Sequence, residues 1–341
     1  MTFRFLLSLI LAATILEVRA QTAGSQKGST FSVSVNLIKV PVSVFDEKGV
    51  MVDILRREDF RVYENGIEQE IRNFGVDRNP ISVVLAIDTS GSSEKEEKEL
   101  KKIKEAAEGF VMALAPEDQV SIIAFSDQVE LAQDWTSDKK LARKAVRKLE
   151  QGLRTALYDA MYAAAHDQAK NIEGRKAIVL LTDGLNNQSS LNFREASLSV
   201  IQSQAALYVI SKSVIIREAA KQQRRVVMLS EIYNRYFGDA DYVEDFFRKR
   251  EAEISDLSEK TGGRALFPSS YDEIKDVYAE FARELKSKHY LTYVSNQEKA
   301  SNSYNNIALE YLPSFSKIIY RKGYYFEPAP IHKRPLSSGR R

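Results

Sequence analysis

The chain of 341 residues contains no cysteine, only three histidines and a single tryptophan. The absence of cysteine excludes disulfides, thiol catalysis, thiolate zinc sites and a thiol-linked lipid anchor. An excess of charge of one sign is also lacking, because 49 Lys and Arg face 47 Asp and Glu. This balance argues against a general nucleic-acid-binding protein. No segment beyond residue 20 has the run of about 20 apolar residues that a membrane-spanning helix needs.

The first 20 residues have the pattern of a secretory signal peptide. Arg4 is followed by an apolar stretch over 5–15, and small residues precede Gln21. The apolar stretch is too short to span a bilayer, so a membrane anchor is the weaker alternative. We predict cleavage after Ala20 and a location outside the cytoplasm, either secreted or in the periplasm or cell envelope.

Two segments with strand periodicity flank the middle of the chain. Over residues 31–76 apolar and polar residues alternate, and Asn65-Gly66 is typical of a hairpin turn. A second β segment is predicted over 289–326. We predict that both segments pack into one small β-sandwich, because 31–76 is too short to be stable alone. The alternative is that each segment extends the central domain separately. Two further segments, 21–30 and 327–341, are predicted to be disordered.

Between the flanks, residues 81–288 alternate apolar strands with helices. This order predicts an α/β domain with a doubly wound, mainly parallel sheet covered by helices on both faces. Within it, 213–259 is long for one connection and is predicted to be a helical insertion. The predicted strands are 83–87, 120–125, 178–181, 206–210 and 264–267, and the predicted helices are 94–114, 139–149, 156–169, 193–203 and 271–288.

Three polar segments of this domain carry oxygen ligands. The strand 83–87 ends on Asp88, which is followed by Ser90 and Ser92; Thr155 precedes a predicted helix; and Asp183 follows another buried strand. In open α/β sheets the carboxyl ends of the strands form the ligand site. Oxygen donors without His or Cys suit a hard divalent cation, with Mg²⁺ expected first and Mn²⁺ or Ca²⁺ as alternatives. Thr155 could instead cap the helix that follows it.

The three segments resemble the metal-ion-dependent adhesion site of von Willebrand factor A domains. The resemblance rests on Asp-x-Ser-x-Ser at 88–92, Gly-x-x-Thr-Ala-Leu-Tyr-Asp-Ala at 152–160 and Thr-Asp-Gly at 182–184. Strings at 59–66, 261–264 and 321–325 extend it to a bacterial group of secreted proteins with such domains. It implies a binding module whose metal accepts an Asp or Glu of a partner protein. Ser93 departs from the family, since many members have Met there, but this position is not a ligand.

Catalysis is the competing interpretation. A metal-assisted hydrolase could use the same cation as a Lewis acid, but no general base is evident beside the three segments. The three histidines, His166, His289 and His332, have no motif around them, and no Gly-x-Gly-x-x-Gly follows a strand. We therefore expect no enzyme activity. A purely structural ion in an envelope scaffold is a third interpretation. The sequence does not identify the partner, the native ion or the oligomeric state.

Overall fold

The computed structural model describes residues 36–91, 94–223, 240–286, 288–296, 303–313 and 317–325. The predicted signal peptide, the segment 21–30, the C-terminal tail and Ser92 lie outside these residues, as does the middle of the predicted insertion. Within the described residues, no helix combines the length and the apolar character that crossing a membrane requires.

A six-stranded sheet forms the centre of the α/β domain, in the order β10-β9-β8-β5-β6-β7. All neighbouring strands run parallel except β7, which is antiparallel to β6. The chain moves from β5 outward to β6 and β7, and then returns to add β8 on the other side of β5. This confirms the predicted doubly wound sheet. The strands are β5 (Ile81–Asp88), β6 (Gln119–Phe125), β7 (Val129–Thr136), β8 (Arg175–Thr182), β9 (Ala206–Ser211) and β10 (Ala265–Leu266).

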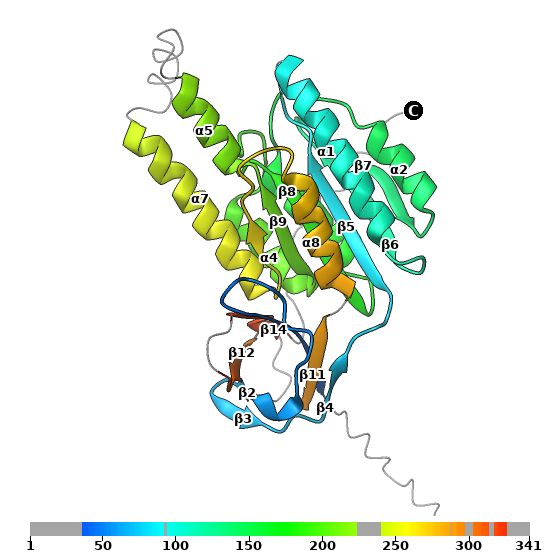
Figure 1. Ribbon diagram of the computed structural model, residues 1–341, viewed down its shortest axis with the longest axis vertical. Helices are drawn as coiled ribbons and strands as arrows, with labels where there is room; N and C mark the ends of the chain where they lie inside the picture. Colours follow the sequence, from blue (N-terminus) through cyan, green and yellow to red (C-terminus); the bar gives the residue numbers. More distant parts are fainter. Residues whose placement is uncertain are drawn as a thin grey trace, which may run out of the picture. The chain divides into compact units, whose positions relative to one another are not determined.

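Helices cover both faces of this sheet (Figure 1). One face packs against α1 (Glu94–Ala113), α2 (Lys139–Arg147) and α8 (Ile274–Lys286). The other packs against α3 (Leu157–Tyr162) with its π-helical continuation η2 (Ala163–Ala169), α4 (Phe193–Ser203) and α7 (Ala240–Lys260). The helix α5 (Ser213–Gln223) contacts α7. Because the central strands are buried on both faces, their sequences are continuous apolar runs, which made them easy to predict.

Strand β7 was not among the predicted strands. It lies at the edge of the sheet, and its residues are mostly half-buried or exposed rather than alternately buried. The pairing between β6 and β7 also shifts register between Val120 and Ile122 and again before Ile123. An irregular edge strand of this kind has no clean two-residue apolar period, so the sequence pattern is weak there.

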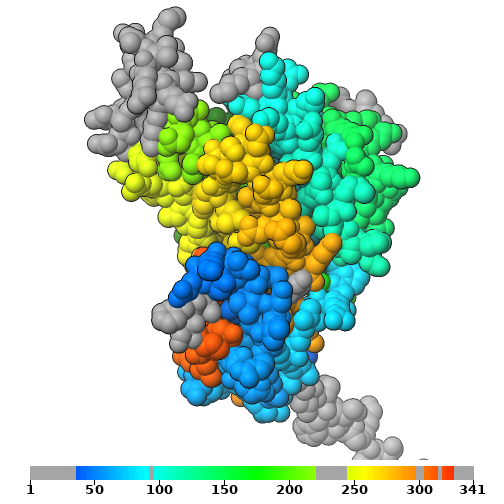
Figure 2. Space-filling model, in the orientation of Figure 1, coloured from blue at the N-terminus to red at the C-terminus, as the bar shows by residue number. Residues whose placement is uncertain are grey.

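The N-terminal and C-terminal β segments form one sandwich, as predicted. One sheet has the order β13-β1-β11-β4 and the other β14-β12-β2-β3, so each sheet mixes strands from both ends of the described chain. Their inner faces share one apolar core, and Figure 2 shows the two segments, blue and orange-red, lying together. The elements are β1 (Leu37–Phe45), η1 (Arg57–Asp59), β2 (Phe60–Glu64), β3 (Ile67–Gln69), β4 (Asn73–Val76), β11 (His289–Val294), β12 (Tyr304–Tyr311), β13 (Lys317–Tyr320) and β14 (Gly323–Tyr325).

The apolar pattern predicts continuous strands over 67–74 and 317–325, but each of them is divided between the two sheets. The return strand of the first hairpin becomes β3 in one sheet and β4 in the other, with a break over 70–72. The last predicted strand divides in the same way into β13 and β14. Apolar periodicity continues through such a corner because both sheets face the same core, so the sequence pattern does not reveal the change of sheet.

A buried ionic cluster joins the sandwich to the α/β domain. The carboxylate of Glu284 in α8, which is 2% exposed, accepts hydrogen bonds from Ser43 (3.0 Å), Tyr208 (2.9 Å) and Arg264 (2.8 Å). The ammonium of Lys288 lies 3.6 Å from the same carboxylate. Burial acts to raise the pKa of Glu284, but Lys288 and Arg264 outweigh it, and the pKa lies below its ordinary value. The carboxylate is therefore charged and fully engaged.

Candidate metal centre

Asp88 is the last residue of β5 and lies at the carboxyl edge of the sheet, where β5 adjoins β8. From β5 the chain continues to β6 on one side and later returns to form β8 on the other side. The end of β5 is therefore the topological switch point of the sheet. The residue is 1% exposed. One oxygen, Oδ1, accepts hydrogen bonds from the backbone N–H of Ser90 (2.9 Å) and from its hydroxyl (2.5 Å). The side chains of Asp88 and Ser90 are therefore in direct contact.

Asp183 follows β8 and meets Asp88 across the two strand ends. Its backbone N–H points to Asp88 Oδ2 at 3.4 Å, and its own Oδ1 accepts a hydrogen bond from Leu185 N at 2.8 Å. Asp183 is 7% exposed. Burial, reinforced by the negative charge of Asp88, raises the pKa of Asp183 to about 7. Two carboxylates are thus held together in a poorly hydrated place that favours a nearby positive charge.

Lys212, which directly follows β9, supplies a positive charge beside the two carboxylates. Its ammonium lies 3.5 Å from Asp88 Oδ2 and its side chain is almost fully buried. The backbone N–H of Lys212 donates to Thr182 O (2.7 Å), which fixes the residue beside the end of β8. Burial acts to lower the pKa of Lys212, but the charges of Asp88 and Asp183 raise it above its ordinary value.

Thr155 is buried in a loop that is attached to both of the others. Gly91 N donates to Gly152 O (2.8 Å) and Gly152 N donates to Thr89 O (3.1 Å), which joins this loop to the one after Asp88. Thr155 N donates to Asn187 Oδ1 (2.8 Å), in the loop after Asp183. The three loops therefore meet at one edge of the sheet.

Gly152 is required by the close approach of the loop after β6. A Cβ at this position would lie 2.2 Å from Ser126 Oγ and 2.9 Å from Asp127 Oδ2. Asp127 Oδ2 in turn accepts a hydrogen bond from Leu153 N at 2.8 Å. The glycine of the Gly-x-x-Thr string thus allows the Thr155 loop to pack against β6, and so places Thr155 toward the strand ends.

Thr155 does not cap the following helix. The N-cap of α3 is Ala156, and no hydrogen bond from its side chain closes the helix end. Ser189 Oγ, from the loop after Asp183, instead accepts the N–H groups of Tyr158 (3.0 Å) and Asp159 (3.2 Å). The capping alternative for Thr155 is therefore wrong, because another loop satisfies the free N–H groups of this helix.

The donor set fits a hard divalent cation that is held by a mixture of charged and neutral oxygens. Asp88 and Asp183 offer carboxylates, while Ser90 and Thr155 place hydroxyls on the connected loops; Ser92 lies outside the described residues. Among the described residues no three His, Asp or Glu side chains gather into a metal-binding cluster. A cation here would therefore depend on the hydroxyls as well as the two acids.

Sequence reasoning missed Lys212, and it also missed Glu99 and Tyr271. Burial first, and then a hydrogen bond and the charge of Glu99, raise the pKa of Tyr271 far above its ordinary value, and the charge of Asp183 contributes. Tyr271 therefore lies within electrostatic range of Asp183, with Glu99 as its hydrogen-bond partner. A signal for Lys212 was available, since it directly follows a buried parallel strand, as Asp183 does. No comparable pattern marks Glu99, which lies on a helix rich in charges.

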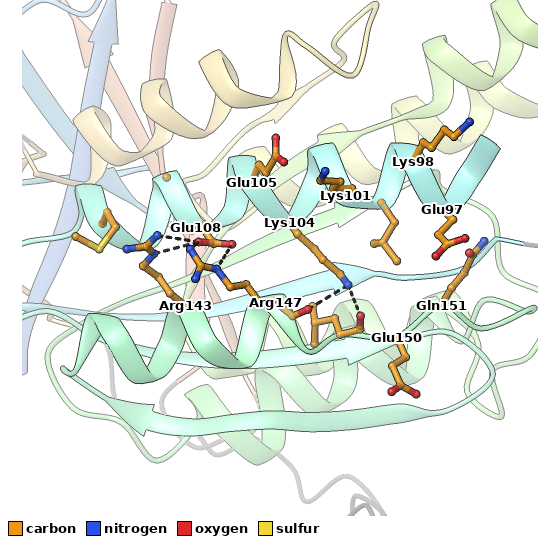
Figure 3. Close-up of a pocket in the computed structure, with 14 residues that line it drawn as sticks. Glu97, Lys98, Lys101, Lys104, Glu105, Glu108, Arg143, Arg147, Glu150 and Gln151 are labelled. Atoms are coloured by element: carbon orange, nitrogen blue, oxygen red, sulfur yellow. Dashed lines mark hydrogen bonds and ion pairs between the residues drawn. The ribbon is translucent and has the colours of Figure 1, made fainter. Parts of the chain in front are cut away.

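A large open groove runs beside the centre between α1 and α2 (Figure 3). Its volume is about 1110 Å³, and it contains none of the candidate ligands. Glu108 binds Arg143 (3.0 Å) and Arg147 (2.7 Å) across it. At one end lies Gln151, next to the Thr155 loop. The groove is therefore a polar surface adjacent to the centre rather than part of it.

The family model of the von Willebrand factor type A domain matches residues 83–186. The chain carries a von Willebrand factor type A domain. The matched segment begins in β5 and ends just after Asp183, so it includes both carboxylates and Thr155. The match supports the domain and its fold, which the described sheet and helices also show.

A curated relative of this chain is the uncharacterized protein sll0103 of Synechocystis sp., which is 31% identical over 136 residues. The match covers 39% of this chain and 31% of that protein, so the chain spans about a third of the relative's length. Solved structures that match this chain include the vWF domain of the type V pili tip protein Mfa5 from Porphyromonas gingivalis (20% identity, 34% of this chain, 43% of that chain, TM-score 0.31). Another is the von Willebrand factor type A protein from Catenulispora acidiphila (9% identity, 86% of this chain, 75% of that chain, TM-score 0.43).

Proposed function

We propose that this protein is a metal-dependent protein-binding module of the cell exterior or envelope. Domains of this family are commonly adhesion or protein-interaction modules. The observation that carries the proposal is the pair of buried carboxylates, Asp88 and Asp183, on neighbouring strand ends, with the Thr155 and Ser90 loops attached to them. Two acids with neutral hydroxyls are a suitable set for Mg²⁺, and Mn²⁺ or Ca²⁺ are the alternatives.

Asp88, Ser90, Ser92, Thr155 and Asp183 are the residues that would hold the ion. When bound, the ion supplies a Lewis-acidic position that an Asp or Glu carboxylate of a partner protein can occupy. The chain's own residues supply the rest. The strand ends hold the two acids at a fixed separation, and the backbone hydrogen bonds between the loops prevent Thr155 from moving away.

Binding rather than catalysis is the function that the surroundings of the centre support. His166 stacks on Tyr162 and contacts Asp167, and His289 stacks on Phe74 in the sandwich. His332 lies outside the described residues. Glu99, the nearby carboxylate on α1, is hydrogen-bonded to Tyr271. The two described histidines and Glu99 are thus engaged in other contacts, and we propose that the protein is not an enzyme.

Calorimetric titration with Mg²⁺, Mn²⁺ and Ca²⁺ tests the ion site. Thr155→Ala should weaken binding by about tenfold or more, because a loop oxygen is lost, whereas Thr155→Ser should bind like the natural protein. Both variants should fold normally, since the hydrogen bonds that hold this loop involve the backbone of Thr155. If Thr155→Ala binds the ion as tightly as Thr155→Ser does, Thr155 is not a ligand.

The partner is tested by immobilising the full chain and capturing envelope and secreted proteins in Mg²⁺ or in chelator. A partner of the proposed kind is retained in Mg²⁺, is released by chelator and is not retained by Thr155→Ala. Replacing the partner's exposed acidic residues one at a time should then identify a single Asp or Glu on which retention depends. Capture that is unaffected by chelator or by Thr155→Ala contradicts the metal-dependent mode.

A further inference from the structure

Lys212 differs from the other candidate residues because it brings a positive charge into a centre proposed to hold a cation. Its ammonium lies 3.5 Å from Asp88 Oδ2, at the carboxyl end of β9, and its side chain is 6% exposed. Its backbone is held by Thr182 O in β8. The ammonium therefore lies close to Asp88. Because the backbone at the strand end is fixed, the ammonium can move away only if the side chain of Lys212 changes its conformation.

The net charge of the centre differs between its metal-free and metal-bound states. With both carboxylates ionised, Asp88, Asp183 and Lys212 together carry one negative charge, and a divalent ion would change this to one positive charge. Without the ammonium, two carboxylates and a divalent ion would be neutral. In a buried site a unit charge a few ångströms away has a large effect on binding. Lys212 and a bound cation therefore compete for the same carboxylate.

Lys176, a half-buried lysine of the same sheet, has a different set of partners. Lys176 lies at the opposite end of β8 and donates to backbone carbonyls, including Ile172 O (2.8 Å) and Ala169 O (3.1 Å). There it satisfies the end of η2, a structural role. Lys212 instead faces the carboxylate of Asp88, a proposed metal ligand.

We propose that Lys212 is a built-in counter-ion that stabilises the metal-free centre and lowers its affinity for divalent cations. The inference rests on the proposed ion site and adds a regulating residue to it. In the metal-free protein the ammonium stabilises the two buried acids. When a cation enters, it must overcome the charge of Lys212, so the centre fills only at cation concentrations higher than its oxygen ligands alone would need.

The test is calorimetric titration of the full chain with Mg²⁺ and Mn²⁺, together with thermal unfolding in chelator and in excess Mg²⁺. Lys212→Met should bind either ion at least about tenfold more tightly, since an opposing charge is removed. The same variant should unfold at a lower temperature in chelator and recover in Mg²⁺. Lys212→Arg keeps the charge and should bind like the natural protein. Lys176→Met is the matched control, with lower stability but unchanged affinity.

The outcomes separate the two proposals. If the natural protein binds Mg²⁺ and Lys212→Met binds it with equal or lower affinity, the role of Lys212 is refuted while the ion site stands. If neither protein binds Mg²⁺, Mn²⁺ or Ca²⁺, the ion site itself is refuted, and this inference with it. If Lys212→Met does not fold in chelator, folding restored by Mg²⁺ supports the role, and Lys212→Gln is titrated in its place. A failure of both variants to fold even in Mg²⁺ refutes a role limited to charge balance.

Discussion

Replacing Asp183 by Asn should stabilise the metal-free protein at neutral and alkaline pH. The pKa of this carboxyl is raised from 3.8 to about 7, chiefly by burial and then by the charge of Asp88. The folded state therefore holds the proton more tightly than the unfolded chain does. This stabilisation is fully present below about pH 4 and is lost as the pH rises through 7, where Asp183 must ionise in a buried place.

The size of the effect follows from the shift. About three pKa units at 1.36 kcal/mol each give an upper limit of about 4 kcal/mol above pH 7. An amide cannot ionise, and its oxygen can still accept the hydrogen bond from Leu185 N. Asp183→Asn should therefore unfold roughly 10 °C higher than the natural protein at pH 8 in chelator, with the difference closing toward pH 4.

Thermal unfolding followed by circular dichroism, in chelator from pH 4 to pH 8, measures this difference directly. The matched control is Asp272→Asn, which removes a carboxylate that is 81% exposed and should leave the unfolding temperature unchanged at each pH. Added Mg²⁺ should stabilise the natural protein at pH 8 but not Asp183→Asn, because one charged ligand is gone. A variant that is no more stable than the natural protein at pH 8, or whose advantage does not change with pH, would refute the reasoning.

Two further predictions concern the framework around the centre. Glu284→Gln should lower the free energy of unfolding by about 3–5 kcal/mol, measured by chemical denaturation, because buried Lys288 loses its counter-charge and Arg264 keeps only Glu280. Gly263→Ala should cost about 2–3 kcal/mol in the same assay, because the added Cβ would lie 2.0 Å from Leu207 O. Its control, Gly109→Ala in α1, meets no atom within 4 Å and should instead add about 0.5–1 kcal/mol. A loss in the control, or none at Gly263, contradicts the packing shown by the structure.

The strands and helices of the α/β domain were largely predictable because burial leaves a direct record in the sequence. Strands covered on both faces must be apolar throughout, as in β5 and β8, and helices covered on one face repeat their apolar residues every three to four positions. The edge strand β7 and the division of β3 from β4 were not predicted. Their residues face partly to solvent or continue the same apolar period across a corner, so local pattern carries no record of the change.

For the candidate ligands, too, the sequence predicted positions along the chain but not the contacts of each residue. Asp88 and Asp183 stand directly after apolar runs, and the topology of an open α/β sheet brings such positions together. The sequence alone left Thr155 with two roles. Only the fold showed that Ser189, from another loop, caps α3 in its place.

By itself the sequence determined the α/β class, the absence of thiol chemistry and the oxygen donors at the ends of the strands, because these depend on composition and on local periodicity. Tertiary structure decided which distant groups share one site. It joined the two β flanks into a sandwich, and it placed Lys212 against Asp88, 124 positions earlier in the chain. The physical reason is that charge balance in a buried site depends on distances across the sheet, and no local sequence pattern encodes those distances.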